Sequence, residues 1–78
     1  MYSIEELYSG TNITEVFTLE DVLMIMEEYQ EDDEEVEALY CYGIRDTDKN
    51  EYIAEGDAYQ VYDIIEKKMY DGIRNSKK

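Results

Sequence analysis

Apolar residues recur along this chain with two spacings, and each spacing predicts one type of element. Two stretches carry apolar side chains three or four residues apart, which places them on one face of a helix. These positions are Leu19, Val22, Leu23, Met26 and Tyr29 in the first stretch, and Ala58, Val61, Tyr62, Ile65 and Met69 in the second. Thr18 and Asp57 precede the two stretches as N-caps. We therefore predict helices over about residues 18–30 and 57–72, the second ending near Gly72.

Between the two helices the apolar residues alternate, which is the spacing of a strand with one buried face. The alternating positions are Val36, Ala38, Tyr40, Tyr42 and Ile44. A polar turn over residues 46–50 and a short return strand over residues 51–55 follow them. Together these features predict a β-hairpin over about residues 35–55.

The start of the chain has a weaker pattern. Ser3 as an N-cap predicts a short helical turn through Tyr8, and the polar residues 9–12 then form a break. Residues 13–17 fit either a brief strand or plain extended chain. With no proline, no linker and no visible internal repeat, we expect a single domain over residues 1–78. Its predicted class is α+β, an antiparallel hairpin packed with two amphipathic helices and a short N-terminal helical turn.

The charge balance narrows the function. The 78 residues hold 21 acidic and 7 basic side chains and no histidine, for a net charge of −14. Most of this chain repels phosphates, so we expect no direct binding of nucleic acid. The longest aliphatic run, residues 22–26, is far shorter than the roughly 20 residues that span a bilayer, and no secretion signal is visible. We expect a cytoplasmic protein that does not bind membranes.

Few side chains offer catalysis or metal binding. Cys41 has no second cysteine or histidine with which to form a disulfide, a metal site or a nucleophile–base pair, and we interpret it as a buried apolar residue. Ser3, Ser9 and Ser76 likewise have no histidine to act as a base. The four glycines are isolated and form no phosphate-binding loop. We therefore expect no enzyme activity, no cofactor and no metal.

The main candidate site is a run of acidic residues. Eight acids fall within eleven residues: Glu27, Glu28, Glu31, Asp32, Asp33, Glu34, Glu35 and Glu37. At the end of a helix such charges oppose the macrodipole and repel one another, so stability alone does not favour them. They form either a solvated loop kept for solubility or a surface that pairs with Lys and Arg of a partner. The hairpin adds further candidates for partner binding: Asp46, Asp48, Glu51, Tyr52 and Glu55.

In size, charge and lack of catalytic residues, the chain is similar to small acidic inhibitors of phages and mobile elements. Such inhibitors include uracil-DNA glycosylase inhibitors, antirestriction proteins and several anti-CRISPR proteins. The similarity implies a nucleic-acid mimic, whose carboxylates occupy the basic groove of a DNA- or RNA-binding protein. No motif of any one of these families accompanies the similarity.

Other features suggest three alternatives. Nine tyrosines suit an interface, and they indicate an adaptor or oligomeric regulator, a homodimer included, that binds through a tyrosine-rich hairpin. Residues 46–53 resemble the start of an EF-hand loop, which makes weak calcium binding a third function. Because Glu51 stands where that loop needs glycine, and Asp57 where it needs a bidentate glutamate, a hairpin turn is favoured there. Residues 22–29 look like the recognition helix of acyl carrier protein, but no serine precedes them to carry its prosthetic group, so we reject that role.

Overall fold

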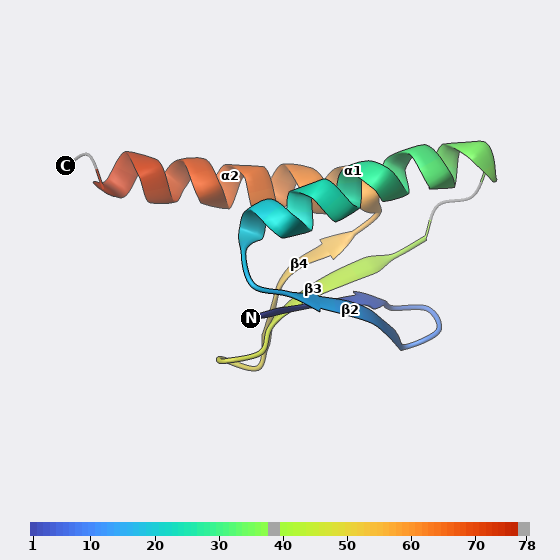
Figure 1. Cartoon of the computed structure of the whole chain (residues 1–78), viewed down its shortest axis with the longest axis horizontal. Coiled ribbons are helices and arrows are strands. Elements are labelled where there is room, and N and C mark those ends of the chain that lie inside the picture. The colour runs from blue at the N-terminus through green and yellow to red at the C-terminus, as the bar shows by residue number, and fades with distance from the viewer. Residues whose placement is uncertain (38–39, 77–78) are drawn as a thin grey trace.

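A computed structural model describes the backbone of residues 1–37 and 40–76, and the side chains of residues 1–37 and 40–71. Its elements are, in order, β1 (Tyr2–Glu6), β2 (Thr11–Val16), α1 (Leu19–Glu35), β3 (Tyr42–Asp46), β4 (Glu51–Gly56) and α2 (Ala58–Ser76). The strands form one antiparallel sheet in the order β2-β1-β3-β4. Both helices lie over the same face of this sheet (Figure 1). The fold is α+β, and the predicted hairpin and both predicted helices are present.

The hydrophobic core lies between the sheet and the two helices. Nine apolar residues are buried there: Ile4, Val22, Met26, Tyr42, Ile44, Ala54, Ala58, Val61 and Ile65. The helical members belong to the two predicted apolar stripes, and the partly buried Leu19, Leu23, Tyr29, Tyr62 and Met69 pack around them. Ile4 and Ile44 face each other across the two central strands. Because successive strand residues point to opposite faces, Glu5 and Arg45 project from the uncovered face of the sheet.

The first residues form a strand, and the predicted helical turn was wrong. Ser3 does not cap a helix but is fully buried within β1, where it pairs with Glu15 of β2 and Arg45 of β3. The local sequence carries an N-cap signal, but pairing on both edges fixes this segment as a strand. β2 also includes most of residues 13–17, so the chain there is a strand.

α1 is longer than the apolar spacing predicts. It begins at the predicted cap, where the Thr18 hydroxyl accepts a hydrogen bond of 3.1 Å from the N–H of Asp21. It then continues through the acidic run to Glu35, and Val36 is its C-cap. The hairpin therefore begins at Tyr42 and not near residue 35. Ala38, which belongs to the predicted strand alternation, lies outside the described residues.

α2 begins at the predicted capping box. The N–H of Gln60 donates to the Asp57 carboxylate at 2.9 Å, and the N–H of Asp57 donates to the Gln60 side chain at 3.0 Å. Both side chains thus satisfy N–H groups that the first turn leaves free. The helix then runs to Ser76, so Gly72 lies within it and does not end it.

The two halves of the chain repeat the same unit, a feature that the sequence did not reveal. Each half is strand, strand, helix, and the two hairpins share one register forty residues apart: Tyr2 pairs with Val16 as Tyr42 pairs with Gly56. The irregularity in pairing also follows Ile4 in one hairpin and Ile44 in the other. β1 and β3 pair symmetrically around these two isoleucines. An approximate two-fold axis therefore passes between Ile4 and Ile44.

Candidate functional site

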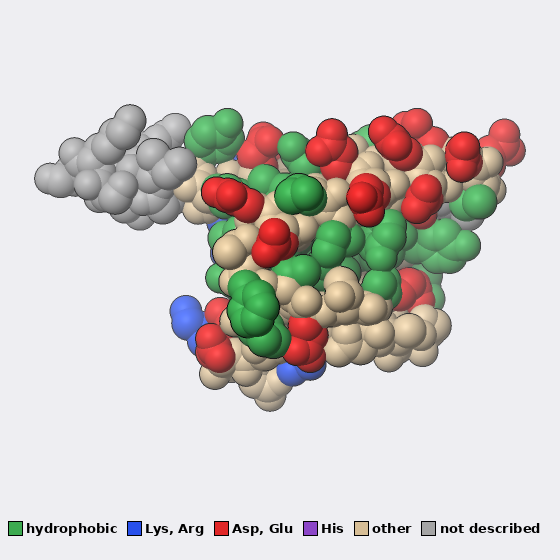
Figure 2. Space-filling model, in the orientation of Figure 1, with side chains coloured by type: hydrophobic (Ala, Val, Ile, Leu, Met, Phe, Trp, Pro, Cys, Tyr) green, Lys and Arg blue, Asp and Glu red, His purple; other side chains and the backbone are tan. Residues whose placement is uncertain are grey.

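The outward surface of α1 is acidic over most of its length. Nine of the 17 residues in α1 are acidic and none is basic. Seven of the nine are exposed, and we call them the acidic α1 face: Glu20, Glu27, Glu28, Glu31, Asp32, Glu34 and Glu35. Figure 2 shows acidic side chains in a row over this helix. The fold therefore presents most of the predicted acidic run as one surface of a regular helix.

The acidic α1 face has nearly the linear charge density of a nucleic-acid strand. A helix of 17 residues is about 25 Å long, so its seven exposed charges average about one per 3.6 Å of axis. One strand of B-DNA carries a charge roughly every 3.4 Å along its axis. The charges are densest in the second half of α1, and Met24, with 66% of its surface exposed, lies beside the first of them, Glu27 and Glu28. A basic groove would thus meet closely spaced carboxylates with one apolar contact.

The charges at the end of α1 are not compensated within the helix. The last turn has acidic residues and no basic one, so its negative charges lie at the negative end of the macrodipole. Among the described side chains, Glu34 accepts a hydrogen bond from the Tyr59 hydroxyl of α2. Glu37 follows the C-cap, is exposed and has a left-handed backbone with φ of 54°.

Asp33 differs from the other predicted site residues because it points into the protein. Only 4% of its surface is exposed, and both carboxylate oxygens lie 3.1 Å from the hydroxyl of the buried Tyr42, which donates to them. Burial raises the pKa of Asp33 above its ordinary value, and the Tyr42 hydroxyl opposes that rise. Asp33 therefore joins α1 to the sheet and does not belong to the partner-facing surface.

The hairpin candidates are not brought together with the acidic α1 face. β3 starts near the C-terminal end of α1 and runs away from it, so the β3–β4 turn lies at the opposite end of the sheet (Figure 1). At this turn Asp48 and Glu51 are exposed, whereas Asp46 is only half-buried and binds its own turn. Glu55 lies at the other end of β4, opposite Gly43, but it follows the buried Ala54 and so projects from the face of the sheet that the helices do not cover. The thirteen predicted residues thus belong to separate regions of the molecule.

The segment that resembles an EF-hand loop is a tight hairpin turn. Residues 47–50 connect β3 to β4, and the Asp46 carboxylate accepts the N–H groups of Asp48 at 3.0 Å and Lys49 at 3.3 Å. The Asn50 side chain accepts a hydrogen bond of 2.9 Å from Arg45. Because β4 begins directly after this turn, the residues cannot form the 12-residue loop of an EF-hand. Within the described part of the chain, no group of three or more His, Cys, Asp or Glu side chains is placed to hold a metal ion.

The uncovered face of the sheet carries a hydrogen-bonded group around Glu5 that the sequence did not predict. Its carboxylate accepts hydrogen bonds from the Tyr52 hydroxyl, from Arg45 at 2.9 Å and from Ser3 at 3.0 Å. These donors, Tyr52 above all, hold the pKa of Glu5 below its ordinary value. Tyr52 also lies across Gly43, where a β-carbon would approach its ring to 3.0 Å. Its hydroxyl is therefore already engaged within the sheet.

The hairpin tyrosines do not form one surface. Tyr42 is buried on the helix side of the sheet, with its ring stacked on Tyr29 at a centroid distance of 5.2 Å. Tyr40 lies beside it, at 6.5 Å between centroids, and has 44% of its surface exposed. Tyr52 is on the opposite face. An interface made of all three hairpin tyrosines is incompatible with this arrangement.

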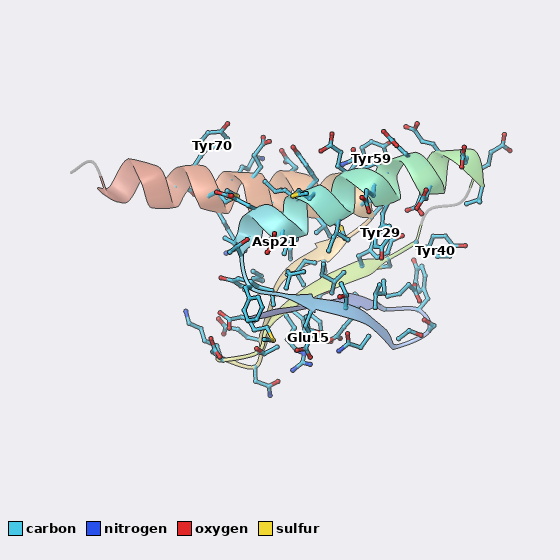
Figure 3. The ribbon with its side chains drawn as sticks, viewed as in Figure 1. Glu15, Asp21, Tyr29, Tyr40, Tyr59 and Tyr70 are labelled. Carbon is cyan, nitrogen blue, oxygen red and sulfur yellow. The ribbon has the colours of Figure 1, made fainter. Side chains whose placement is uncertain are left out.

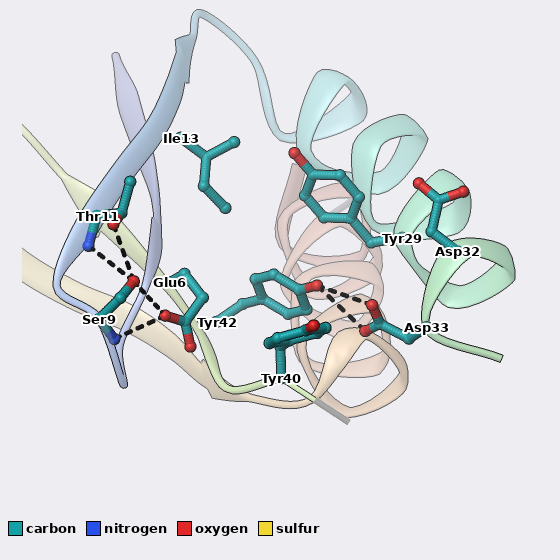
Figure 4. A pocket seen from close by; sticks show the side chains of 9 residues that line it. All are labelled: Glu6, Ser9, Thr11, Ile13, Tyr29, Asp32, Asp33, Tyr40 and Tyr42. Atoms are coloured by element: carbon teal, nitrogen blue, oxygen red, sulfur yellow. Dashed lines mark hydrogen bonds between the residues drawn. The ribbon is translucent and has the colours of Figure 1, made fainter. Parts of the chain in front are cut away.

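A groove beside the C-terminal half of α1 is a second feature that the sequence did not predict. It has a volume of about 490 Å³, and the first hairpin forms its other wall. Figure 4 shows Ile13 of β2 opposite Tyr29 of α1, with Tyr40 and Tyr42 between the strands and the helix. Acidic side chains of Glu6, Asp32 and Asp33 also line it. We call this feature the tyrosine groove. Figure 3 shows that Tyr29 and Tyr40 lie under the same end of α1.

Comparison with known proteins and a search for membrane-spanning helices both gave no match. No family model, no curated protein and no solved structure matches this chain. Over the residues that the structure describes, neither helix is long and apolar enough to cross a membrane.

Proposed function

We propose that this protein is a non-enzymatic inhibitor that binds the nucleic-acid-binding surface of another protein through its acidic α1 face. In this proposal the exposed carboxylates take the place of phosphates and exclude DNA or RNA from the partner. Its similarity in size and charge to phage and mobile-element inhibitors favours a partner among bacterial defence or DNA-processing proteins, met in the cytoplasm.

The observation that carries the proposal is the negative charge of α1, with seven exposed acids, no base and a mean spacing close to that of strand phosphates. A partner that neutralises phosphates with Lys and Arg would meet a similar charge density here. Because Val22 and Met26 anchor the helix in the core, the backbone that carries its carboxylates is held in place before binding. A preorganised surface loses less conformational entropy on association than a flexible acidic loop would.

The proposal also explains an arrangement that stability does not favour. Acidic residues fill the end of α1, where the macrodipole disfavours them, and neighbouring acids repel one another. Solubility alone would be served by acids at any exposed position. Concentration of the charge on one helix is instead what a surface for a basic partner requires.

The test is capture of a partner from a nuclease-treated bacterial lysate, with a first wash at about 0.1 M salt and a second at about 0.5 M. The second wash shortens the screening length and so weakens electrostatic contacts. We expect a basic nucleic-acid-binding protein that is released at the higher salt. The purified partner should bind either an oligonucleotide or this protein, but not both. A partner that binds both at once would contradict mimicry.

Two matched variants assign the surface. In the first, Glu27, Glu28, Glu31 and Glu35 are replaced by Lys. In the second, the same change of charge is made away from α1, at Glu15, Asp48, Glu51 and Glu55, which are exposed as well. We expect the first variant to lose most of its association rate and the second to keep most of it, since local charge steers the encounter. Equal losses in both variants would reject the acidic α1 face as the site.

A further inference from the structure

The edge of the sheet that β2 forms is open. β2 is the first strand in the order β2-β1-β3-β4, so it pairs only with β1, and no other described backbone group bonds to it. An open edge is a template for pairing with another chain, and many proteins block it with lysine or proline. β2 contains neither of these residues, and its only charged side chain is Glu15.

The other edge strand, β4, is the equivalent of β2 in the second half of the chain and provides a comparison. Ile13 and Ile53 occupy equivalent positions, because each is left without a partner where the pairing of its hairpin shifts. Ile53 packs against the core, and the neighbouring Ala54 has only 5% of its surface exposed. Ile13 is exposed instead, with 37% of its surface open to solvent. The first half therefore leaves apolar surface open at a position that the second half covers.

The tyrosine groove is the space on the helix side of the β2 edge. Ile13 of β2 lines one wall and Tyr29 of α1 lines the other. Figure 4 shows Ile13 directed toward Tyr29 across open space. Two residues, Phe17 and Thr18, connect β2 to α1, whereas Asp57 alone connects β4 to α2. The two helices thus begin at different places relative to their hairpins, and the groove remains beside the first one.

The surroundings of the β2 edge are negatively charged. The first basic residue of the chain is Arg45, which pairs with Glu5, so β1, β2 and α1 contribute no base. Glu15 is exposed and lies on the side of the sheet away from the helices (Figure 3). A strand placed beside β2 would therefore meet an apolar groove on one face and a carboxylate on the other.

We propose that the protein partner binds the open edge of β2 through an extended segment in which apolar and basic residues alternate. This inference rests on the proposed function and adds a second contact with the same partner beside the acidic α1 face. Successive side chains of a strand point to opposite faces, so the apolar set enters the tyrosine groove and the basic set lies beside Glu15. Main-chain hydrogen bonds to the edge supply affinity, and the groove and Glu15 select the sequence.

A second copy of this protein would fit the open edge less well than a basic segment. Pairing of two β2 strands would join the two sheets and bring both α1 helices onto one face. Each α1 has nine acids and no base, and each chain has a net charge of −14, so the two copies repel each other. A basic segment is attracted by the same charges.

The experiment compares two fluorescent peptides of identical composition. In one peptide lysine and valine alternate, and in the other the valines form a single block. Their charges are equal, so general attraction to an acidic protein is the same for both. We expect fluorescence anisotropy to show about 10-fold tighter binding of the alternating peptide, the gain from burial of one apolar side chain.

Methylation of the peptide backbone tests strand pairing without any change to the protein. Alternate residues of a strand direct their N–H groups to opposite edges, and only one of these edges faces β2. N-methylation of all valines and N-methylation of all lysines should therefore have unequal effects, with binding lost in one case and kept in the other. Equal effects of the two modifications would contradict strand addition.

Amide chemical shifts and one pair of variants locate the site. During titration with the alternating peptide, the amide signals of β2 should move, and those of β4, the equivalent edge, should not. Ile13→Ser removes an apolar wall of the groove and should abolish the preference for the alternating peptide. Val36→Ser, at an exposed apolar position that does not line the groove, should keep it. Circular dichroism checks that both variants are folded.

The outcomes separate this inference from the proposed function. Equal binding of the two peptides, with shifts confined to α1, would overturn the strand site and leave the acidic surface in place. Shifts of β2 that appear without peptide as the protein concentration rises would mean that a second copy occupies the edge, and would also overturn it. A captured partner that binds an oligonucleotide and this protein together would reject mimicry but not strand addition.

Discussion

At the scale of single residues, the contact between Asp33 and Tyr42 shows how the fold uses one acid of an acidic run. Asp33 occupies a buried position on α1 where the helix would ordinarily carry an apolar side chain. The Tyr42 hydroxyl supplies the hydrogen bond that makes burial of this carboxylate tolerable. Seven other acids of α1 remain exposed, so its sequence neighbours give no sign that Asp33 is different.

Tyr42→Phe removes this hydroxyl without changing the packing of the ring, and we expect it to destabilise the protein by about 1–3 kcal/mol at neutral pH. The pKa of Asp33 is already raised in the folded state, and loss of a donor raises it further. Below the pKa of the unfolded chain, about 3.9, Asp33 is protonated in both states and the penalty is small. The penalty should therefore grow as the pH rises through the folded pKa.

Urea unfolding of both proteins across this pH range measures the difference. Tyr40→Phe is the control, because that ring is half-exposed and removal of its hydroxyl leaves no buried carboxylate without a donor. A Tyr42→Phe penalty that does not vary with pH would contradict an ionised, hydrogen-bonded Asp33.

At the scale of elements, α1 combines a well-formed beginning with an unfavourable end. Thr18 caps its first turn, and Glu20 and Asp21 lie at the positive end of the macrodipole. Its last turn carries acids at the negative end of that dipole. The same type of side chain therefore stabilises one end of the helix and destabilises the other.

Glu35→Lys and Glu20→Lys make the same change of charge at the two ends of α1. We expect Glu35→Lys to raise the free energy of unfolding by about 0.3–1 kcal/mol. Glu20→Lys should be less stable than Glu35→Lys by a similar amount. Both variants lower the net negative charge equally, so their difference in free energy of unfolding isolates the helix dipole. Equal stabilities would show that the dipole is irrelevant here.

The helices could be predicted from the sequence because their signals are local. Apolar spacing and caps lie within each segment, so Thr18 and the Asp57–Gln60 pair marked both starts correctly. The end of α1 was missed because its inward position after Tyr29 is Asp33, which interrupts the apolar pattern. β1 was missed because its pairing with β3 depends on residues about forty positions away.

The candidate site was predictable only in its composition. The acidic run is visible in the sequence, but which carboxylates share a surface depends on the helical phase, and Asp33 was misplaced for that reason. The tyrosine groove required the contact between two elements, since Ile13 and Tyr29 come from different parts of the chain. The sequence shows the tyrosines of this groove, but it does not show which residues lie next to them.

At the scale of the whole molecule, negative charge exceeds what internal ion pairs balance. The net charge is −14, and three ion pairs form among the described residues: Glu5–Arg45, Asp63–Lys67 and the terminal amine with Asp48. Self-repulsion therefore opposes the compact state.

Salt should stabilise this protein. We expect the free energy of unfolding, measured in urea, to rise when sodium chloride increases from about 0.1 M to about 0.5 M, because screening weakens repulsion more than it weakens a few ion pairs. The variant with four lysines on α1 should show a smaller rise. A fall in stability with salt would mean that ion pairs outweigh repulsion.

The approximate two-fold axis has a further consequence, which a comparison with a symmetric dimer of one half makes clear. Glu5 and Arg45 occupy equivalent positions of the two halves and form an ion pair of 2.9 Å beside the axis. In a homodimer of one half, the same residue would be present on both sides, so two acids or two bases would meet there. In a single covalent chain, equivalent positions of the two halves carry different residues. The acid and the base that meet beside the axis are therefore a pair that two identical halves could not form.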